Sequence, residues 1–136
     1  MNDDIQAHAL ARVFAVLRPD LRVEPVPVTP GIYDELDARF DHFKGHVLVS
    51  EYAFSEPWPT WERHPAGDEI VILLAGSAQM IVRTKDGERT LALSTPGDHV
   101  VVPMGAWHTA RPLAPTRMLF VTPGEGTQNA ETPDAL

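Results

Sequence analysis

From residue 46 onward, short apolar runs alternate with turn residues at close intervals, a pattern that predicts strands rather than helices. Asp86-Gly87 is typical of a hairpin turn, and Pro96-Gly97 of a second tight turn. The run Ile70–Leu74 is apolar without alternation, so we expect both faces of its strand to be buried. Many short strands indicate a β-sandwich or barrel. The predicted strands cover residues 46–54, 60–64, 69–75, 78–84, 89–93, 99–103, 107–112 and 116–122.

The first 45 residues follow a different pattern. Apolar residues recur at helical spacing between residues 3 and 17, and Asp3 and Asp4 suit a helix start, so a helix is predicted there. Residues 23–30 contain three prolines, which allow an extended arm or an edge strand. Residues 32–43 can form a second, short helix. The chain then divides into an N-terminal helical and extended arm packed on the barrel (1–45), the barrel (46–123) and a C-terminal tail (124–136).

Composition narrows the possible partners. At 136 residues the chain is expected to form one domain. The formal net charge of −8 argues against nucleic acid or an anionic membrane as a partner. There is no apolar run of membrane-spanning length. The sequence contains no cysteine, which excludes disulfides and thiolate metal ligands and is compatible with a cytoplasmic location.

Two histidine-bearing segments carry the candidate chemistry. The first runs from Trp61 to Glu69 and contains His64, and the second runs from Gly97 to His108. Together they resemble the two motifs of the cupin family. The second cupin motif reads glycine, five residues, proline, one residue, glycine, two residues and histidine. This chain matches all four positions with Gly97, Pro103, Gly105 and His108. The first motif contains a His-x-His pair, a glutamate and a glycine, and the matching residues are His64, Glu69 and Gly76.

Three positions depart from the cupin pattern. Glu62 stands where the family has its first histidine, Glu56 where it has a glycine, and Pro112 where it has an asparagine. The resemblance covers about residues 46–123. Within the family, the sequence is similar to small single-domain bacterial cupins without an established activity. It implies an all-β, double-stranded β-helix (jelly-roll barrel) with a short N-terminal helical extension. It also implies pairing into a homodimer, with residues 23–30 as a candidate pairing segment.

The resemblance implies a metal site formed by His64, Glu69 and His108. Strand geometry adds Glu62, because residues two apart point to the same face and Glu62 can point with His64 into the barrel. Nitrogen and oxygen ligands without sulfur suit one divalent ion of Fe, Mn, Ni, Zn or Cu. Glu62 has two possible roles. If Glu62 is a fourth ligand, the two carboxylates together cancel the charge of a divalent ion. If Glu62 stays off the metal, it could serve as the general base beside a two-histidine, one-carboxylate site.

The expected function is a metal-dependent enzyme acting on a small polar organic molecule, with oxygenation or isomerisation of a carbonyl or hydroxy-acid compound favoured. The alternative is a non-catalytic binding or sensing protein whose metal is structural. Among other residues, Asp68 is expected in a turn, and His99 is expected either packed in the fold or at the rim of the barrel. Trp58 and Trp61 are expected to pack the barrel mouth, where either could also contact a ligand.

Overall fold

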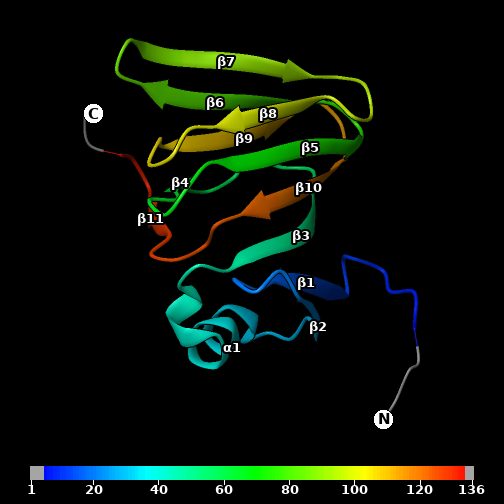
Figure 1. Ribbon diagram of the computed structural model, residues 1–136. Helices are drawn as coiled ribbons and strands as arrows, with labels where there is room; N and C mark the ends of the chain where they lie inside the picture. Colours follow the sequence, from blue (N-terminus) through cyan, green and yellow to red (C-terminus); the bar gives the residue numbers. More distant parts are fainter. Residues whose placement is uncertain (1–4, 134–136) are drawn as a thin grey trace.

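The computed structural model describes residues 5–133 and arranges them as two antiparallel sheets with one short α-helix at the lower end (Figure 1). The first sheet has six strands in the order β2 (Val23–Pro27), β1 (Val13–Leu17), β3 (Val47–Phe54), β10 (Thr116–Thr122), β5 (Glu69–Ala75) and β8 (His99–Val102). The second has five, in the order β11 (Gln128–Ala130), β4 (Trp61–Arg63), β9 (His108–Pro112), β6 (Ala78–Thr84) and β7 (Gly87–Leu93). The predicted jelly-roll architecture is thus confirmed.

The main core lies between the two sheets. On β5, Glu69, Val71 and Leu73 point inward and are buried, whereas the alternate residues on the outer face are only half-buried. We expected both faces of this strand to be buried, but only its inner face is buried in the single chain. The buried core residues are Val71, Leu73, Ala78, Met80, Val82, Leu93, Val102, Ala110, Met118 and Phe120.

The predicted helix over residues 3–17 is wrong. Residues 5–9 have no regular structure, Val13–Leu17 forms β1, and Asp3 and Asp4 lie outside the described residues. Phe14 and Val16 are buried, and the other three residues of the strand are half-buried. Because all five residues are apolar, the segment fits helical and strand spacing equally well. Pairing with β2 on one side and β3 on the other decides for the strand.

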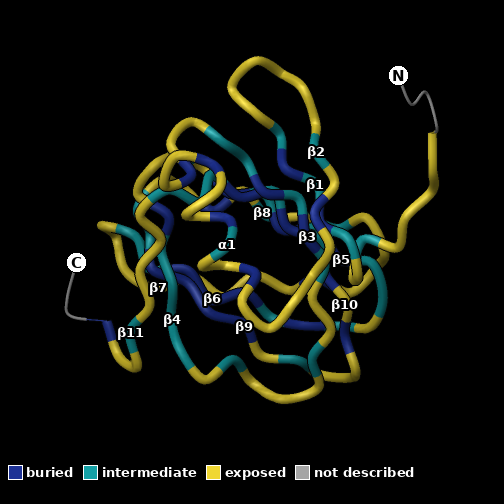
Figure 2. Tube along the Cα trace, turned by 90° about the horizontal axis from the view of Figure 1, so that it is seen from below, coloured by how far each residue is buried: buried dark blue, intermediate teal, exposed yellow. Residues whose placement is uncertain are grey.

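The other two N-terminal predictions are confirmed. β2, with its prolines, is the edge strand of the six-stranded sheet. The predicted short helix is α1 (Ile32–Arg39), followed by the single turn η1 (Asp41–Phe43). Acidic residues in the first turn of α1 and Arg39 in the last suit the helix dipole. Seen from below, α1 lies over the sheets (Figure 2), where it closes a second core of Phe14, Val16, Val26, Ile32, Leu36, Phe40, Phe43 and Leu48.

The turn after α1 has an unusual backbone. Asp41, His42 and Phe43 are consecutive non-glycine residues with φ values of 54°, 52° and 60°. Such left-handed conformations bring Cβ close to the following carbonyl oxygen and are disfavoured for residues other than glycine. The turn directs Phe43 into the second core.

The predicted C-terminal tail contains a strand that the sequence did not predict. β11 pairs with β4 from Gln128↔Arg63 to Ala130↔Trp61 and forms the edge of the five-stranded sheet. This matters for the site because β4 is only three residues long and pairs with β9 at a single position, Glu62↔His108. No helix in the described part of the chain is long and apolar enough to cross a membrane.

Candidate metal centre

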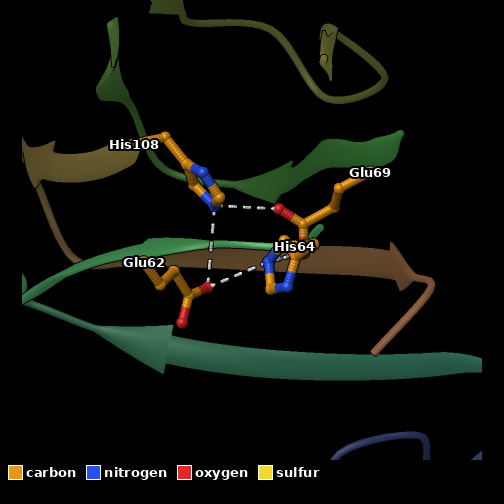
Figure 3. A group of neighbouring side chains, drawn as sticks. All are labelled: Glu62, His64, Glu69 and His108. Atoms are coloured by element: carbon orange, nitrogen blue, oxygen red, sulfur yellow. Dashed lines mark ion pairs between the residues drawn. The ribbon is translucent and has the colours of Figure 1, made fainter. Parts of the chain in front are cut away.

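All four side chains predicted for the metal site meet inside the barrel (Figure 3). Glu62 lies on β4, His64 directly follows that strand, Glu69 begins β5 and His108 begins β9. Each offers one nitrogen or oxygen atom, and these atoms all lie within 4.8 Å of one another. The centre therefore joins both sheets, because β4 and β9 belong to one and β5 to the other.

The distances between these atoms fit ligation of one ion. Nε2 of His64 lies 3.1 Å from Oε2 of Glu69, and Nε2 of His108 lies 3.1 Å from Oε1 of Glu69. Oε1 of Glu62 lies 3.6 Å from Nε2 of His64 and 3.7 Å from Nε2 of His108. Two ligands each about 2.1 Å from a metal are separated by about 3.0 Å at a right angle and about 3.4 Å at a tetrahedral angle. The residues present can thus hold a divalent ion.

Hydrogen bonds on the far side of each ring orient the two histidines. The Thr127 hydroxyl donates to the Gly124 carbonyl oxygen at 2.9 Å, so its oxygen accepts from Nδ1 of His64, also at 2.9 Å. Nδ1 of His108 donates to the carbonyl oxygen of Ala106 at 3.0 Å, since a carbonyl can only accept. In the neutral state both rings therefore present the Nε2 lone pair to the centre, which is the tautomer that a metal requires.

The two carboxylates differ in their surroundings. Glu69 is 2% exposed, and its Oε2 accepts a hydrogen bond of 2.6 Å from the Thr122 hydroxyl. Glu62 has a side chain that is 27% exposed, and its ion-pair partners among the described residues are the two histidines. Glu69 is therefore held rigidly in the barrel, whereas Glu62 is the carboxylate with freedom to move.

Charge holds the four groups in their ionised forms when no metal is bound. Burial alone would lower the pKa of the histidines, but Glu62 and Glu69 outweigh it and raise the pKa of His64 to about 9 and that of His108 to about 10. Burial would likewise raise the pKa of Glu62, yet the histidines lower it to about 2, and they lower the pKa of Glu69 too. Two carboxylates and two imidazolium ions sum to zero charge. A divalent ion that displaces the two protons keeps that balance.

A cavity of about 610 Å³ adjoins the centre and is bordered by Glu62, His64 and Glu69. Trp58, predicted at the barrel mouth, lines this cavity and packs against the main core. Trp61 does not line it; the guanidinium of Arg83 lies over its ring at 5.0 Å. α1 contributes Tyr33, Leu36 and Asp37 to the wall, so the N-terminal segment closes part of the cavity.

Other sequence predictions near the site can be placed. Asp68 accepts a hydrogen bond from the Met104 amide at 2.8 Å and so ties together the turns of the two motifs. His99 is exposed and lies outside the cavity wall, as expected for a rim residue. Thr122 and Thr127, which hold Glu69 and His64, were not predicted. Only their hydroxyl groups mark them in the sequence, and their partners lie 53 and 63 residues away.

No protein-family model matches the chain, and a comparison with curated proteins found no match. Solved structures do match it. Peruvianin-I, described as a cysteine peptidase from Thevetia peruviana latex, aligns over 60% of this chain and 54% of its own, with 17% identity and a TM-score of 0.51. A cupin-2 domain protein from Shewanella frigidimarina aligns over 57% of this chain and 70% of its own, with 19% identity and a TM-score of 0.48.

A cupin superfamily protein from Desulfitobacterium hafniense aligns over 56% of this chain and 65% of its own, with 26% identity and a TM-score of 0.46. The motif residues His64, Glu69 and His108 meet between the two antiparallel sheets of this chain. The described residues thus have the two-sheet jelly-roll fold that the resemblance to cupins implied.

Proposed function

We propose that this protein binds one divalent metal ion through His64, Glu69 and His108, and that it is an enzyme acting on a small organic molecule in the adjoining cavity. One observation carries the metal site. With both rings neutral, Nε2 of His64, Nε2 of His108 and Oε1 of Glu69 are buried acceptors that face one another with no proton to share, and they make no hydrogen bond in the described structure. A buried polar atom left unpaired costs about 1–3 kcal/mol. One ion satisfies all three atoms at once.

The proposed chemistry follows from the ligand set and from Glu62. An ion of Fe, Mn, Ni, Cu or Zn would supply Lewis-acid or redox chemistry at this centre. Glu62 lines the cavity and lies 3.6 and 3.7 Å from the two histidines, where its carboxylate can ligate the ion or accept a proton from a bound molecule. These properties support oxygenation or isomerisation of a carbonyl or hydroxy compound. The adjoining cavity favours this function over a purely structural metal, because a structural site is closed by its ligands.

Metal analysis tests the site. We expect wild-type protein, stripped with a chelator and reconstituted, to retain one metal ion per chain after dialysis. His108→Ala should retain far less, whereas His99→Ala, a control outside the cavity, should match the wild type. A full equivalent in His108→Ala would rule out the proposed ligand set.

Catalysis needs a separate measurement. Oxygen uptake by Fe(II)-loaded protein in the presence of a bound compound would indicate an oxygenase. Rearrangement of that compound without oxygen uptake would indicate an isomerase. Binding without turnover for any metal would favour the non-catalytic alternative.

We also propose a homodimer in the cytoplasm. The outer face of the six-stranded sheet is apolar and incompletely covered: Ile70, Ile72 and Leu119 are half-buried, and Val101 is 53% exposed. A second copy would cover this face. Light scattering should then give twice the chain mass of 15.0 kDa. Ile72→Glu should give the monomer mass, and Leu113→Glu, on an exposed turn elsewhere, should not.

The cysteine-free composition supports the cytoplasm, which cell fractionation would test.

A further inference from the structure

The cavity beside the metal centre has a distinctive charge. Its wall includes no lysine or arginine among the described residues but does include four carboxylates, Asp37, Glu51, Glu62 and Glu69. Two of these already have partners, because Asp37 pairs with His42 at 2.9 Å and Glu51 with Arg117 at 3.0 Å. A divalent ion would balance the other two. An anionic ligand would therefore bring an uncompensated negative charge into a partly desolvated space, where like charges repel more strongly than in water.

The same wall is rich in aromatic rings. Six of the ten aromatic residues of the chain line it, namely Phe14, Tyr33, Phe43, Tyr52, Trp58 and Phe120. Tyr33 and Tyr52 are 67% and 52% exposed, so they lie at the mouth. Trp58 lies deeper, with its ring 5.8 Å from that of Phe120 and 6.4 Å from that of His108. Rings at such spacing favour a planar apolar ligand by stacked or edge contacts.

One polar group of this wall lacks a partner. Nε1 of Trp58 is buried and donates no hydrogen bond within the described residues. Indole nitrogen is a donor only, so it can be satisfied only by an acceptor. Because the Trp58 ring packs beside His108, an acceptor bound there would lie next to the metal centre.

We propose that the cavity takes an uncharged aryl compound bearing a carbonyl or hydroxyl oxygen, with its ring among these aromatic residues and its oxygen accepting from Trp58. The inference rests on the proposed function and deepens it. It narrows the expected carbonyl or hydroxy-acid compounds to uncharged ones. Three observations agree on this class: the charge of the wall, its aromatic content and the unpaired donor.

Three small probes that differ in one property each can test the substrate class. Phenylacetamide and phenylacetate have nearly the same shape but differ by one charge, and cyclohexylacetamide keeps the amide but lacks the aromatic ring. Each would be titrated calorimetrically into protein reconstituted with Zn²⁺, which is redox-inert. We expect phenylacetamide to bind at least about tenfold more tightly than either of the others, with dissociation constants in the millimolar range or below.

Variants assign the effect to residues. Trp58→Phe keeps a ring but removes the N–H, and should weaken phenylacetamide about tenfold, as expected for one hydrogen bond of about 1.4 kcal/mol. Asn129 lines the cavity opposite Glu62 on the neighbouring strand. Asn129→Lys should therefore strengthen phenylacetate about tenfold, whereas Asn129→Gln should not. Zinc content, measured on every sample, shows whether the centre is intact.

The outcomes separate the two proposals. Wild-type protein that retains no metal would overturn the proposed function. Protein that holds metal but binds phenylacetate as tightly as phenylacetamide would overturn the substrate class and leave the metal site standing. The same conclusion follows if neither aryl compound binds in the millimolar range, or if cyclohexylacetamide binds as well as phenylacetamide.

Discussion

Glu62 and Glu69 offer the same functional group to the same two histidines, yet their surroundings assign them different tasks. Glu69 is fully buried and fixed by the Thr122 hydroxyl. Glu62 is partly exposed and faces the cavity from a strand only three residues long. The rigid carboxylate is suited to hold an ion, and the mobile one to respond to what enters the cavity.

Glutamine substitutions should separate these tasks. Both variants keep an oxygen but remove one negative charge. We expect Glu69→Gln to lower metal affinity about 100-fold or more and Glu62→Gln about tenfold. Glu51→Gln, in the same cavity wall but paired with Arg117, should leave the affinity unchanged. The measurement is competition with a chelating dye. An unchanged affinity in Glu62→Gln would remove Glu62 from the ligands and leave it the role of base.

Thr127 should matter through His64 alone. Thr127→Val removes the acceptor for Nδ1 of His64 while keeping the side-chain shape, and loss of such an orienting bond typically costs 10–100-fold in metal affinity. Thr127→Ser keeps the hydroxyl and should bind metal nearly as the wild type does. The same competition assay checks both. Equal metal affinities for the two variants would show that the His64 ring does not depend on this hydroxyl for its orientation.

At the scale of elements, the left-handed turn of η1 stores backbone strain beside the cavity. Asp41 has a φ of 54°, and its side chain makes no hydrogen bond with the described residues. Asp41→Gly should relieve this strain. We expect it to stabilise the metal-free protein by about 0.5 kcal/mol, the strain relief being partly offset by the greater freedom of glycine in the unfolded chain.

The reverse change supplies the control for this prediction. Gly45 has a φ of 73°, and a Cβ there would lie 3.2 Å from the Pro19 ring, so Gly45→Ala should destabilise the protein. Urea unfolding of both variants measures the two effects. A destabilised Asp41→Gly would mean that the aspartate stabilises the turn in a way that outweighs its backbone conformation.

How well the sequence predicts each element depends on what specifies that element. Residues 69–75, 78–84 and 116–122 form strands with the predicted bounds, because turn residues delimit them and their apolar pattern has a single solution. β1 was mistaken for a helix because its apolar residues fit two periods and its partner strands lie elsewhere in the chain. β11 has no apolar alternation at all; pairing with β4 makes it a strand.

The site divides in the same way. The resemblance to the two cupin motifs implied His64, Glu69 and His108 as ligands, and the period of two in strands added Glu62. Thr122, Thr127 and the part of α1 that walls the cavity could not be predicted, because their relation to the centre arises from packing between distant segments. Local pattern thus predicts which groups gather, and the tertiary structure determines what surrounds them.

For the whole molecule, the four charged groups make stability depend on pH differently with and without metal. Without metal, the raised histidine pKa values stabilise the fold below about 6.5, and this contribution is lost as pH rises through about 9 and 10. The lowered pKa of Glu62 contributes above 4.5 and is lost as pH falls through about 2. With metal, ligation requires both histidines to be deprotonated, so metal affinity rises with pH and offsets the loss of histidine stabilisation.

Melting temperatures should reveal the difference between these two forms. Between pH 6.5 and about 9 we expect the Tm of metal-free protein to fall, whereas the Tm of metal-saturated protein should stay nearly level because its histidines and those of the unfolded chain are then both deprotonated. In His108→Ala the fall of the metal-free protein should flatten, because one of the two raised histidines is gone. Parallel curves for the two forms of the wild type would contradict the charge balance described for the centre.

The position of the centre across the two sheets has a further consequence. A bound ion would tie residues 64, 69 and 108 together and so would join strands of both sheets in a protein without cysteine. Such an ion would act as a reversible cross-link, the role that a disulfide plays in other proteins. The sheets could then separate only after the ion had left, so a chelator should shorten the lifetime of the folded chain.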